Sequence, residues 1–279
     1  MPSTSLAAVA LGLIAAAGWG AGDFFGGLGS RRASVFLVVL ITDATGLLIL
    51  IAVTLIWREP PPPLATWLWG GTAGLSGALG LTALYRALAS GRMGIAAPVA
   101  AVIGAAIPVG VGALFEGLPG VPQMAGFALA LPAVWLIARS ESGPGEARGF
   151  GLAILAGVLF AGFFICFERA GQGSTFWPLV TSRVAAVAVL GSIVLGNRQA
   201  QRIGGALREA VLAGLFDIVG NVFYVLAAQA GRLDVAVVVS SLYPVGTVIL
   251  ARVLLKEHLT RPQALGIALS AAAIVLIAV

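Results

Sequence analysis

Apolar runs of about 20 residues follow one another along nearly the whole chain, and short polar breaks separate them. A run of this length lets an α-helix cross a membrane, because each residue adds about 1.5 Å and the hydrocarbon core is about 30 Å thick. Ten such runs can be counted, and each predicts a helix. The predicted helices cover residues 6–29, 33–57, 65–90, 94–115, 121–139, 149–168, 175–196, 207–230, 233–254 and 262–279.

The composition supports lipid as the solvent of this chain. Apolar residues make up 59% of it and charged residues only 10%, whereas soluble domains carry about 25% charged residues. The net charge of +5 does not indicate nucleic-acid binding, because the basic residues stand singly between apolar runs and form no patch. We therefore expect a polytopic membrane protein with the lipid bilayer, and no nucleic acid, as its partner.

Several other classes of protein are disfavoured by what the chain lacks. Cys166 is its only cysteine and His258 its only histidine, so neither a disulfide framework nor a zinc site is expected. No cofactor is expected either. The residues ahead of the first apolar run carry no basic segment, and we interpret that run as a membrane span rather than a signal peptide.

The two halves of the chain repeat each other at an offset of about 140 residues. Three groups of residues recur near this offset: Gly12-Leu13, Ala17-Gly18 and Phe24-Phe25 as Gly151-Leu152, Ala156-Gly157 and Phe163-Phe164; Gly91-Arg92 as Gly231-Arg232; and Pro122-Gln123 as Pro262-Gln263. Five helices per repeat is an odd number, so the second repeat enters the membrane from the opposite side. The expected fold is all-α, with ten transmembrane helices as two inverted five-helix repeats, residues 1–143 and 144–279, around a central cavity. Inverted repeats are typical of secondary transporters.

The basic residues predict an orientation. Most of them lie in or beside the odd-numbered loops, and the positive-inside rule places those loops in the cytoplasm and both termini outside. An outer aromatic belt is expected from Trp57, Trp67, Trp69 and Trp177.

Two motifs in the second half carry a family resemblance. Ser241-Leu242-Tyr243-Pro244-Val245 is followed by a segment in which Glu257, Thr260, Gln263 and Gly266 are spaced as Glu-x-x-Thr-x-x-Gln-x-x-Gly. These motifs, together with Trp19-Gly20, resemble the EamA repeat of the drug/metabolite transporter superfamily. With two five-helix repeats, the resemblance covers the whole chain. The first half departs from the pattern, because Glu116 is followed by residues 117–120, Gly-Leu-Pro-Gly, rather than Arg-Leu-Thr.

The resemblance implies a basket-like transporter of the cell inner membrane, not an enzyme. Members export amino acids, nucleosides, drugs or other metabolites, often in exchange for protons. A small organic metabolite, such as an amino acid or related compound, is the expected substrate, with multidrug efflux as an alternative. Members are described with cytoplasmic termini; we keep the opposite prediction from the charges. A monomer is sufficient to enclose a cavity, and a dimer is possible.

Ionisable residues inside the spans are the candidate site, because each is costly in lipid and needs a partner or a watery cavity. Asp217 lies near the middle of the helix over 207–230, with Asn221 and Tyr224 on the same face. Arg183 lies at a similar depth, which predicts an Asp217–Arg183 ion pair. The pair can be a static clamp between two helices, or its carboxylate can exchange Arg183 for a proton or a cationic substrate group.

A second cluster is expected from Asp23, Asp43 and Arg86, which we place at similar depth. Asp43 occupies the position that matches Arg183 in the other repeat, whereas Asp23 is also open to interpretation as an interfacial residue.

Trp19 is too deep for the belt, so it either stacks on a substrate or packs in the core. Tyr243 and Pro244 are expected near the middle of the helix over 233–254, and Pro98 and Pro108 in its counterpart. Proline in both matched helices indicates either a broken helix beside the substrate or ordinary kinking.

Two other classes of function stay open. Residues 20–23 read Gly-Ala-Gly-Asp, which matches the Gly-x-Gly-Asp motif of intramembrane aspartyl proteases, but the chain has no Tyr-Asp for a second acid. A channel or scramblase would need a continuous polar path, which a sequence does not reveal.

Overall fold

Every regular element that the computed structural model describes is a helix, as the apolar runs predicted. The structure describes residues 2–90, 93–116, 120–139, 144–170, 176–196, 203–230, 239–240 and 242–278. Its long helices are α1 (Pro2–Ser30), α2 (Val35–Trp57), α3 (Leu64–Ser90), α4 (Met93–Glu116), α5 (Val121–Arg139), α6 (Pro144–Ala170), α7 (Trp177–Gly196), α8 (Leu207–Ala230), α10 (Tyr243–Leu254) and α11 (Arg261–Ala278). A short 3-10 helix, η2 (Gly204–Ala206), leads into α8.

The polar and proline-rich breaks end the helices for identifiable reasons. Arg58 follows α2 in the left-handed conformation, with φ of 52°, and its N–H bonds back to the carbonyl of Leu55. The prolines over residues 60–63 cannot continue a helix, because they lack the backbone donor. The next helix therefore starts only at Leu64.

The prediction for Tyr243 and Pro244 was wrong. They do not lie near the middle of a helix but at the start of α10, where Pro244 occupies the first turn. Proline is favoured there because the first N–H groups of a helix have no partner within it. Residues 233–238 and 241, which the predicted helix also covered, lie outside the described residues. Pro98 and Pro108, by contrast, lie inside α4 as expected.

Five stretches of the described chain are long and apolar enough to cross a membrane: Ala7–Ser30, Val35–Trp57, Gly149–Phe167, Trp177–Gly196 and Gly204–Ala227. The predicted belt tryptophans lie at helix ends. Trp57 ends α2, Trp67 and Trp69 lie in the first turns of α3, and all three are exposed. Trp177 begins α7 and is half-buried.

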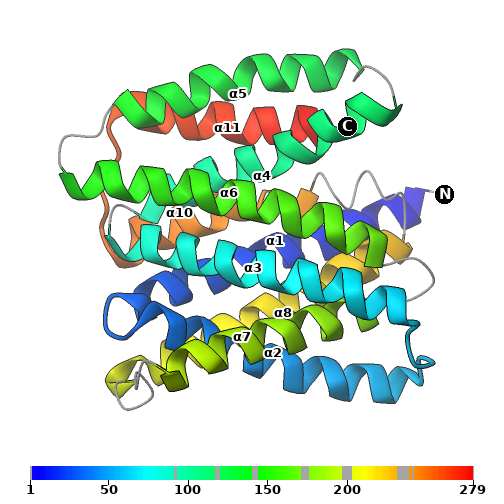
Figure 1. Cartoon of the computed structure of the whole chain (residues 1–279). Coiled ribbons are helices and arrows are strands. Elements are labelled where there is room, and N and C mark those ends of the chain that lie inside the picture. The colour runs from blue at the N-terminus through cyan, green and yellow to red at the C-terminus, as the bar shows by residue number, and fades with distance from the viewer. Residues whose placement is uncertain are drawn as a thin grey trace.

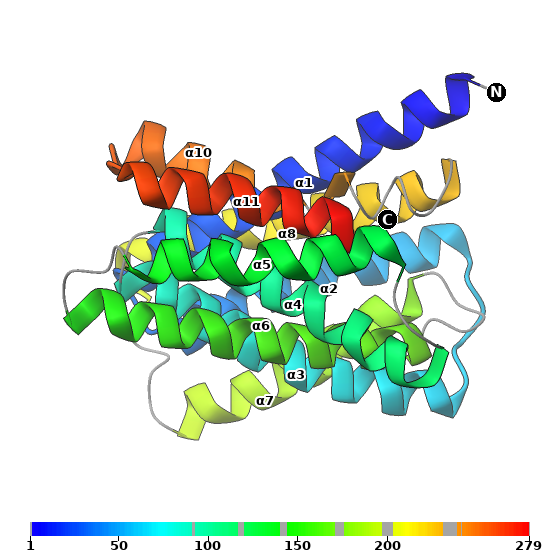
Figure 2. The ribbon, with the colours of Figure 1, turned by 90° about the horizontal axis from the view of Figure 1, so that it is seen from above.

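The most extensive helix contacts join the first five helices to the last five. α1 packs along α8, α3 along α6, and α5 along α11, and α2 contacts α7 as α4 contacts α10. Figure 1 shows α5 and α11 side by side at one edge of the bundle and α2 with α7 at the opposite edge. The two chain termini lie toward the same end of the bundle in both views (Figure 1 and Figure 2).

Glycines let the backbones of α1, α8 and α10 approach closely. A Cβ atom at Gly20 would lie 2.6 Å from the carbonyl oxygen of Tyr243 and 3.0 Å from Cα of Gly246. One at Gly18 would lie 2.7 Å from the backbone nitrogen of Gly220. Small residues at such crossings are typical of membrane helices, where packing rather than water drives association. These crossings bring Trp19 and Asp23 of α1 toward the middle of the bundle.

Candidate functional site

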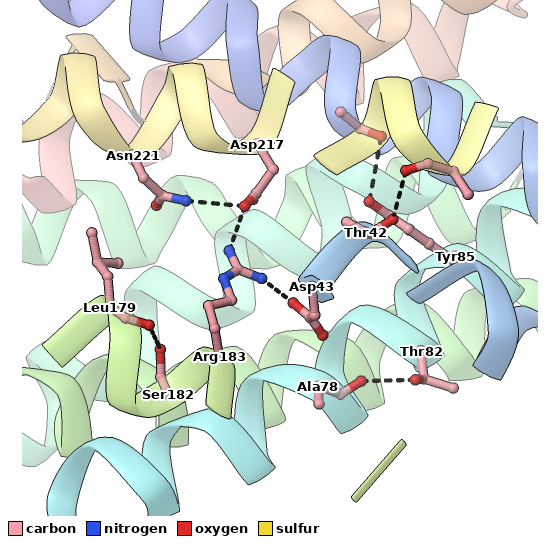
Figure 3. Close-up of polar contacts among 12 residues, drawn as sticks. Thr42, Asp43, Ala78, Thr82, Tyr85, Leu179, Ser182, Arg183, Asp217 and Asn221 are labelled. Atoms are coloured by element: carbon pink, nitrogen blue, oxygen red, sulfur yellow. Dashed lines mark hydrogen bonds and ion pairs between the residues drawn. The ribbon is translucent and has the colours of Figure 1, made fainter. Parts of the chain in front are cut away.

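Arg183 of α7 joins two carboxylates from different helices. Its Nη1 donates to Oδ1 of Asp43 on α2, and its Nη2 donates to Oδ2 of Asp217 on α8. Figure 3 shows the guanidinium between the two acids. The ion pair between Arg183 and Asp217 was predicted from their depth and is confirmed. The sequence did not predict that Asp43 would bind the same arginine.

Asn221 completes the surroundings of Asp217. Its Nδ2 lies 3.0 Å from Oδ2 of Asp217, one helical turn away on α8 (Figure 3). Asp43 is less well satisfied: it is 1% exposed, and its Oδ2 is buried without a hydrogen-bond partner in the described part of the chain. An unpaired polar atom in apolar surroundings is costly, so Oδ2 of Asp43 is open to a hydrogen bond from a molecule in the cavity.

The expected cluster of Asp23, Asp43 and Arg86 does not form. Arg86 is exposed on the outside of α3, and it makes no ion pair with any described residue. Its neighbour Tyr85 is the residue that turns inward, fully buried, with its hydroxyl 3.4 Å from the carbonyl oxygen of Gly22. One position along a helix is a rotation of about 100°, so depth alone could not reveal this difference.

Asp23 lies on α1 beside the same cavity and is only 9% exposed. No hydrogen bond or ion pair reaches its carboxylate from the described residues. Burial of this extent places the side chain among the helices rather than on the outer surface of the bundle.

Trp19 lies one turn before Asp23 on α1 and packs with two tyrosines. Its ring centroid is 5.6 Å from that of Tyr224 and 6.2 Å from that of Tyr243, which meets it edge-on. Trp19 and Tyr243 also line the cavity. In this position Trp19 packs against the tyrosine rings, and its indole can also contact a solute in the cavity.

The cavity has a volume of about 190 Å³ and is lined by residues from both halves of the chain. Its charged groups are Asp23, Asp43, Asp217 and Arg183. Aromatic rings of α6, among them Phe160 and Phe163, and small residues of α3 and α4 form much of the remaining wall. A largely apolar wall with a few convergent polar groups is the usual build of a small-molecule site. Pro244, although buried, is not among the lining residues.

The arrangement of the acids does not suit an aspartyl protease. That chemistry needs two carboxylates that share a proton. Asp43 and Asp217 are instead both held by the guanidinium of Arg183. Those residues also contain no group of three or more His, Cys, Asp or Glu side chains that could hold a metal ion.

A set of ion pairs at one end of the bundle was missed by the sequence analysis. Glu257 accepts from the backbone N–H of Met93 at the start of α4, at 3.1 Å, and lies 3.6 Å from Arg31. Arg32 lies 2.6 Å from Glu209 of α8. Glu257 belongs to the Glu-x-x-Thr motif, so that motif could have indicated a structural contact. These pairs join the first half of the chain to the second.

Comparisons with known proteins agree with this picture. The model of the EamA-like transporter family matches residues 147–279. A protein of known crystal structure is similar in fold, with a TM-score of 0.66 and 21% sequence identity over 96% of this chain and 95% of its own. No curated protein matches. The apolar helices indicate a multi-pass membrane protein, and residues 147–279 are similar to the EamA-like transporter family.

Proposed function

We propose that this protein is a secondary transporter that carries a small organic solute across the cell inner membrane by alternating access. The EamA-like match supports transport of small molecules rather than an enzymatic activity. Amino acids or related compounds are the first substrates to test, with export, exchange for protons and multidrug efflux as variants of the same mechanism.

One observation carries this proposal: a charged cluster faces a solute-sized cavity inside a bundle of apolar helices. A charge at this depth costs about 3 kcal/mol or more, and such residues usually mark a substrate or ion pathway. The guanidinium of Arg183 bridges carboxylates of α2 and α8, which belong to different halves. A relative movement of the halves would have to rearrange these bonds, so the cluster is suited to couple movement to binding.

The proposed architecture is a pair of inverted five-helix repeats, residues 1–143 and 144–279. The pattern of helix contacts supports it. The contact of α1 with α8 has a counterpart in that of α6 with α3, as expected if the halves are exchanged by a two-fold axis. Three further contacts, α2 with α7, α4 with α10 and α5 with α11, each join helices in matching positions. Two such units can open alternately toward either side while the site between them stays in place.

The proposed orientation places the loops that carry Arg31, Arg32 and Lys256 in the cytoplasm and both termini outside. The positive-inside rule supports it, because these loops lie at the end of the bundle away from the termini (Figure 1).

Counterflow in proteoliposomes tests the proposal. Purified protein should exchange labelled against unlabelled solute from a panel of amino acids, amines and neutral metabolites, and the exchange should saturate. Flux that rises without saturation would favour the channel or scramblase alternative. No flux above empty liposomes for any class of solute, from protein that remains folded, would contradict transport.

A further inference from the structure

We infer that the cavity selects organic cations, which bind at Asp23, over solutes that carry a carboxylate. This inference rests on the proposed transport function and narrows its substrate to an amine with a small apolar or aromatic body. Amino acids would then be poor substrates compared with the corresponding amines.

The first argument is the state of Asp23. It lines the cavity, is 9% exposed, and receives no hydrogen bond or ion pair from the described residues. A carboxyl group in apolar surroundings is stable either as the neutral acid or as a carboxylate beside a positive charge. Asp23 is therefore available to a cation that enters the cavity.

The second argument is that the protein offers this site no spare positive charge. Three carboxylates and one guanidinium line the cavity. The single positive charge of Arg183 is already shared by Asp43 and Asp217, which each accept from one of its terminal nitrogens. A solute carboxylate would add a further negative charge to three acids and one base, whereas a solute ammonium would relieve the excess of negative charge.

The groups that face Asp23 from the neighbouring helices agree with this charge balance. They are Asp217 on α8, Asp43 on α2, Arg183 on α7, Tyr243 on α10 and Tyr85 on α3. The wall that α4 contributes is made of alanine and glycine. Arg183 is the one basic group among them, and it is bound to both Asp43 and Asp217.

The third argument is the aromatic wall beside Asp23. Trp19 lies four positions before it on α1, hence on the same helical face, and the ring of Tyr243 stands edge-on to the indole. Cations are attracted to the faces of such rings, and tryptophan is the best of them. The size of the cavity, about 190 Å³, limits the solute. An engineered cavity of about 150 Å³ holds benzene, so one aromatic ring with a small charged group is the expected scale.

The test uses benzyltrimethylammonium, which keeps its charge at every pH. Its uncharged analogue is neopentylbenzene, in which carbon replaces the nitrogen, and phenylalanine serves as the zwitterion of similar size. Binding of radiolabelled benzyltrimethylammonium to the purified full chain is measured by equilibrium dialysis, with the other two compounds as competitors. We expect saturable binding that unlabelled probe displaces at least about tenfold better than either competitor.

Substitutions assign the effect to Asp23. Asp23→Asn should lower the affinity for benzyltrimethylammonium by about tenfold or more, while Asp23→Glu retains binding. Arg86→Gln removes one charge from an exposed position outside the cavity and should leave the affinity unchanged. Size-exclusion profiles establish that each variant is folded. If Asp23→Asn does not fold, the inference is tested by the competition experiment on the unmodified protein, which should prefer the cation to neopentylbenzene.

Three results would overturn the inference: no binding of the probe to folded protein, equal displacement by neopentylbenzene, or unchanged affinity in folded Asp23→Asn. Its failure is distinguishable from failure of the proposed function. Saturable counterflow of a zwitterion or neutral solute that is insensitive to Asp23 would leave transport standing and reject cation selection. If the probe binds in a manner that depends on Asp23 but no solute shows saturable flux, cation selection would stand and the proposed transport function would be rejected.

Discussion

Arg183 on α7 forms an ion pair with Asp43 on α2, the residue 140 positions before it in the chain. This separation is also the offset at which the sequence motifs recur, so in the proposed architecture of inverted repeats each residue contacts its own counterpart from the other half. In that architecture, counterparts can touch only close to the axis that relates the halves. An acid at one position and a base at the other turn what would be a repulsion between like charges into an attraction.

Arg183→Ala is expected to destabilise the protein more than the removal of all three charges does. The single substitution leaves Asp43 and Asp217 buried without a counter-charge, which costs about 3–5 kcal/mol. The combined variant Asp43→Asn/Arg183→Ala/Asp217→Asn avoids that cost. Thermal unfolding in detergent micelles measures the difference, with Ser192→Ala on the exposed face of α7 as the control. Equal unfolding temperatures for the single and the combined variant would show that the cluster is not a clamp.

Asp217→Asn is expected to abolish transport or to remove its dependence on a pH gradient. The amide keeps the shape of the side chain but can neither carry a negative charge nor release a proton. Flux is measured in proteoliposomes with and without an imposed pH gradient. Thr82→Val is the control: it removes a buried hydroxyl that donates only within α3, so it should leave the flux and its pH dependence unchanged. Full activity with an unchanged pH dependence would exclude Asp217 from coupling.

Gly20→Ala should loosen the crossing of α1 and α10. The added Cβ would lie 2.6 Å from the carbonyl oxygen of Tyr243, so the backbones would have to separate. Overpacking of this kind costs about 1–3 kcal/mol. Gly71→Ala is the matched control, because nothing lies within 4 Å of the Cβ that it adds. The unfolding temperature should fall for Gly20→Ala and stay unchanged for Gly71→Ala. Equal unfolding temperatures for the two variants would mean that α10 lies farther from α1 than the structure shows.

A cross-link between the halves at their charged end should stop transport reversibly. Arg32 and Glu209 form an ion pair there at 2.6 Å, and Cys166 is the only native cysteine, so Cys166→Ser makes the background thiol-free. Arg32→Cys/Glu209→Cys treated with a short bis-methanethiosulfonate should lose counterflow and regain it on reduction. Each single-cysteine variant, treated alike, should keep its activity. Undiminished counterflow in the fully cross-linked protein would mean that this end does not open during transport.

The long apolar runs determined the helices, because a span of about 20 residues is a local property of the chain. The depth of Asp217 and Arg183 followed from counting residues along two such helices, and so did their pairing. The start of α10 at Tyr243 was harder to locate, because proline is found both inside membrane helices and in the first helical turn.

What the sequence alone determined about this protein is its solvent, its helices and the height of each costly charge along them. Only the tertiary structure decided which charges meet, because rotation about a helix axis and the choice of neighbouring helix depend on packing between distant segments. In the folded protein Arg86 points outward and Tyr85 inward, and Asp43 forms an ion pair with Arg183. Asp23 lies beside Trp19 and forms no hydrogen bond or ion pair with the described residues.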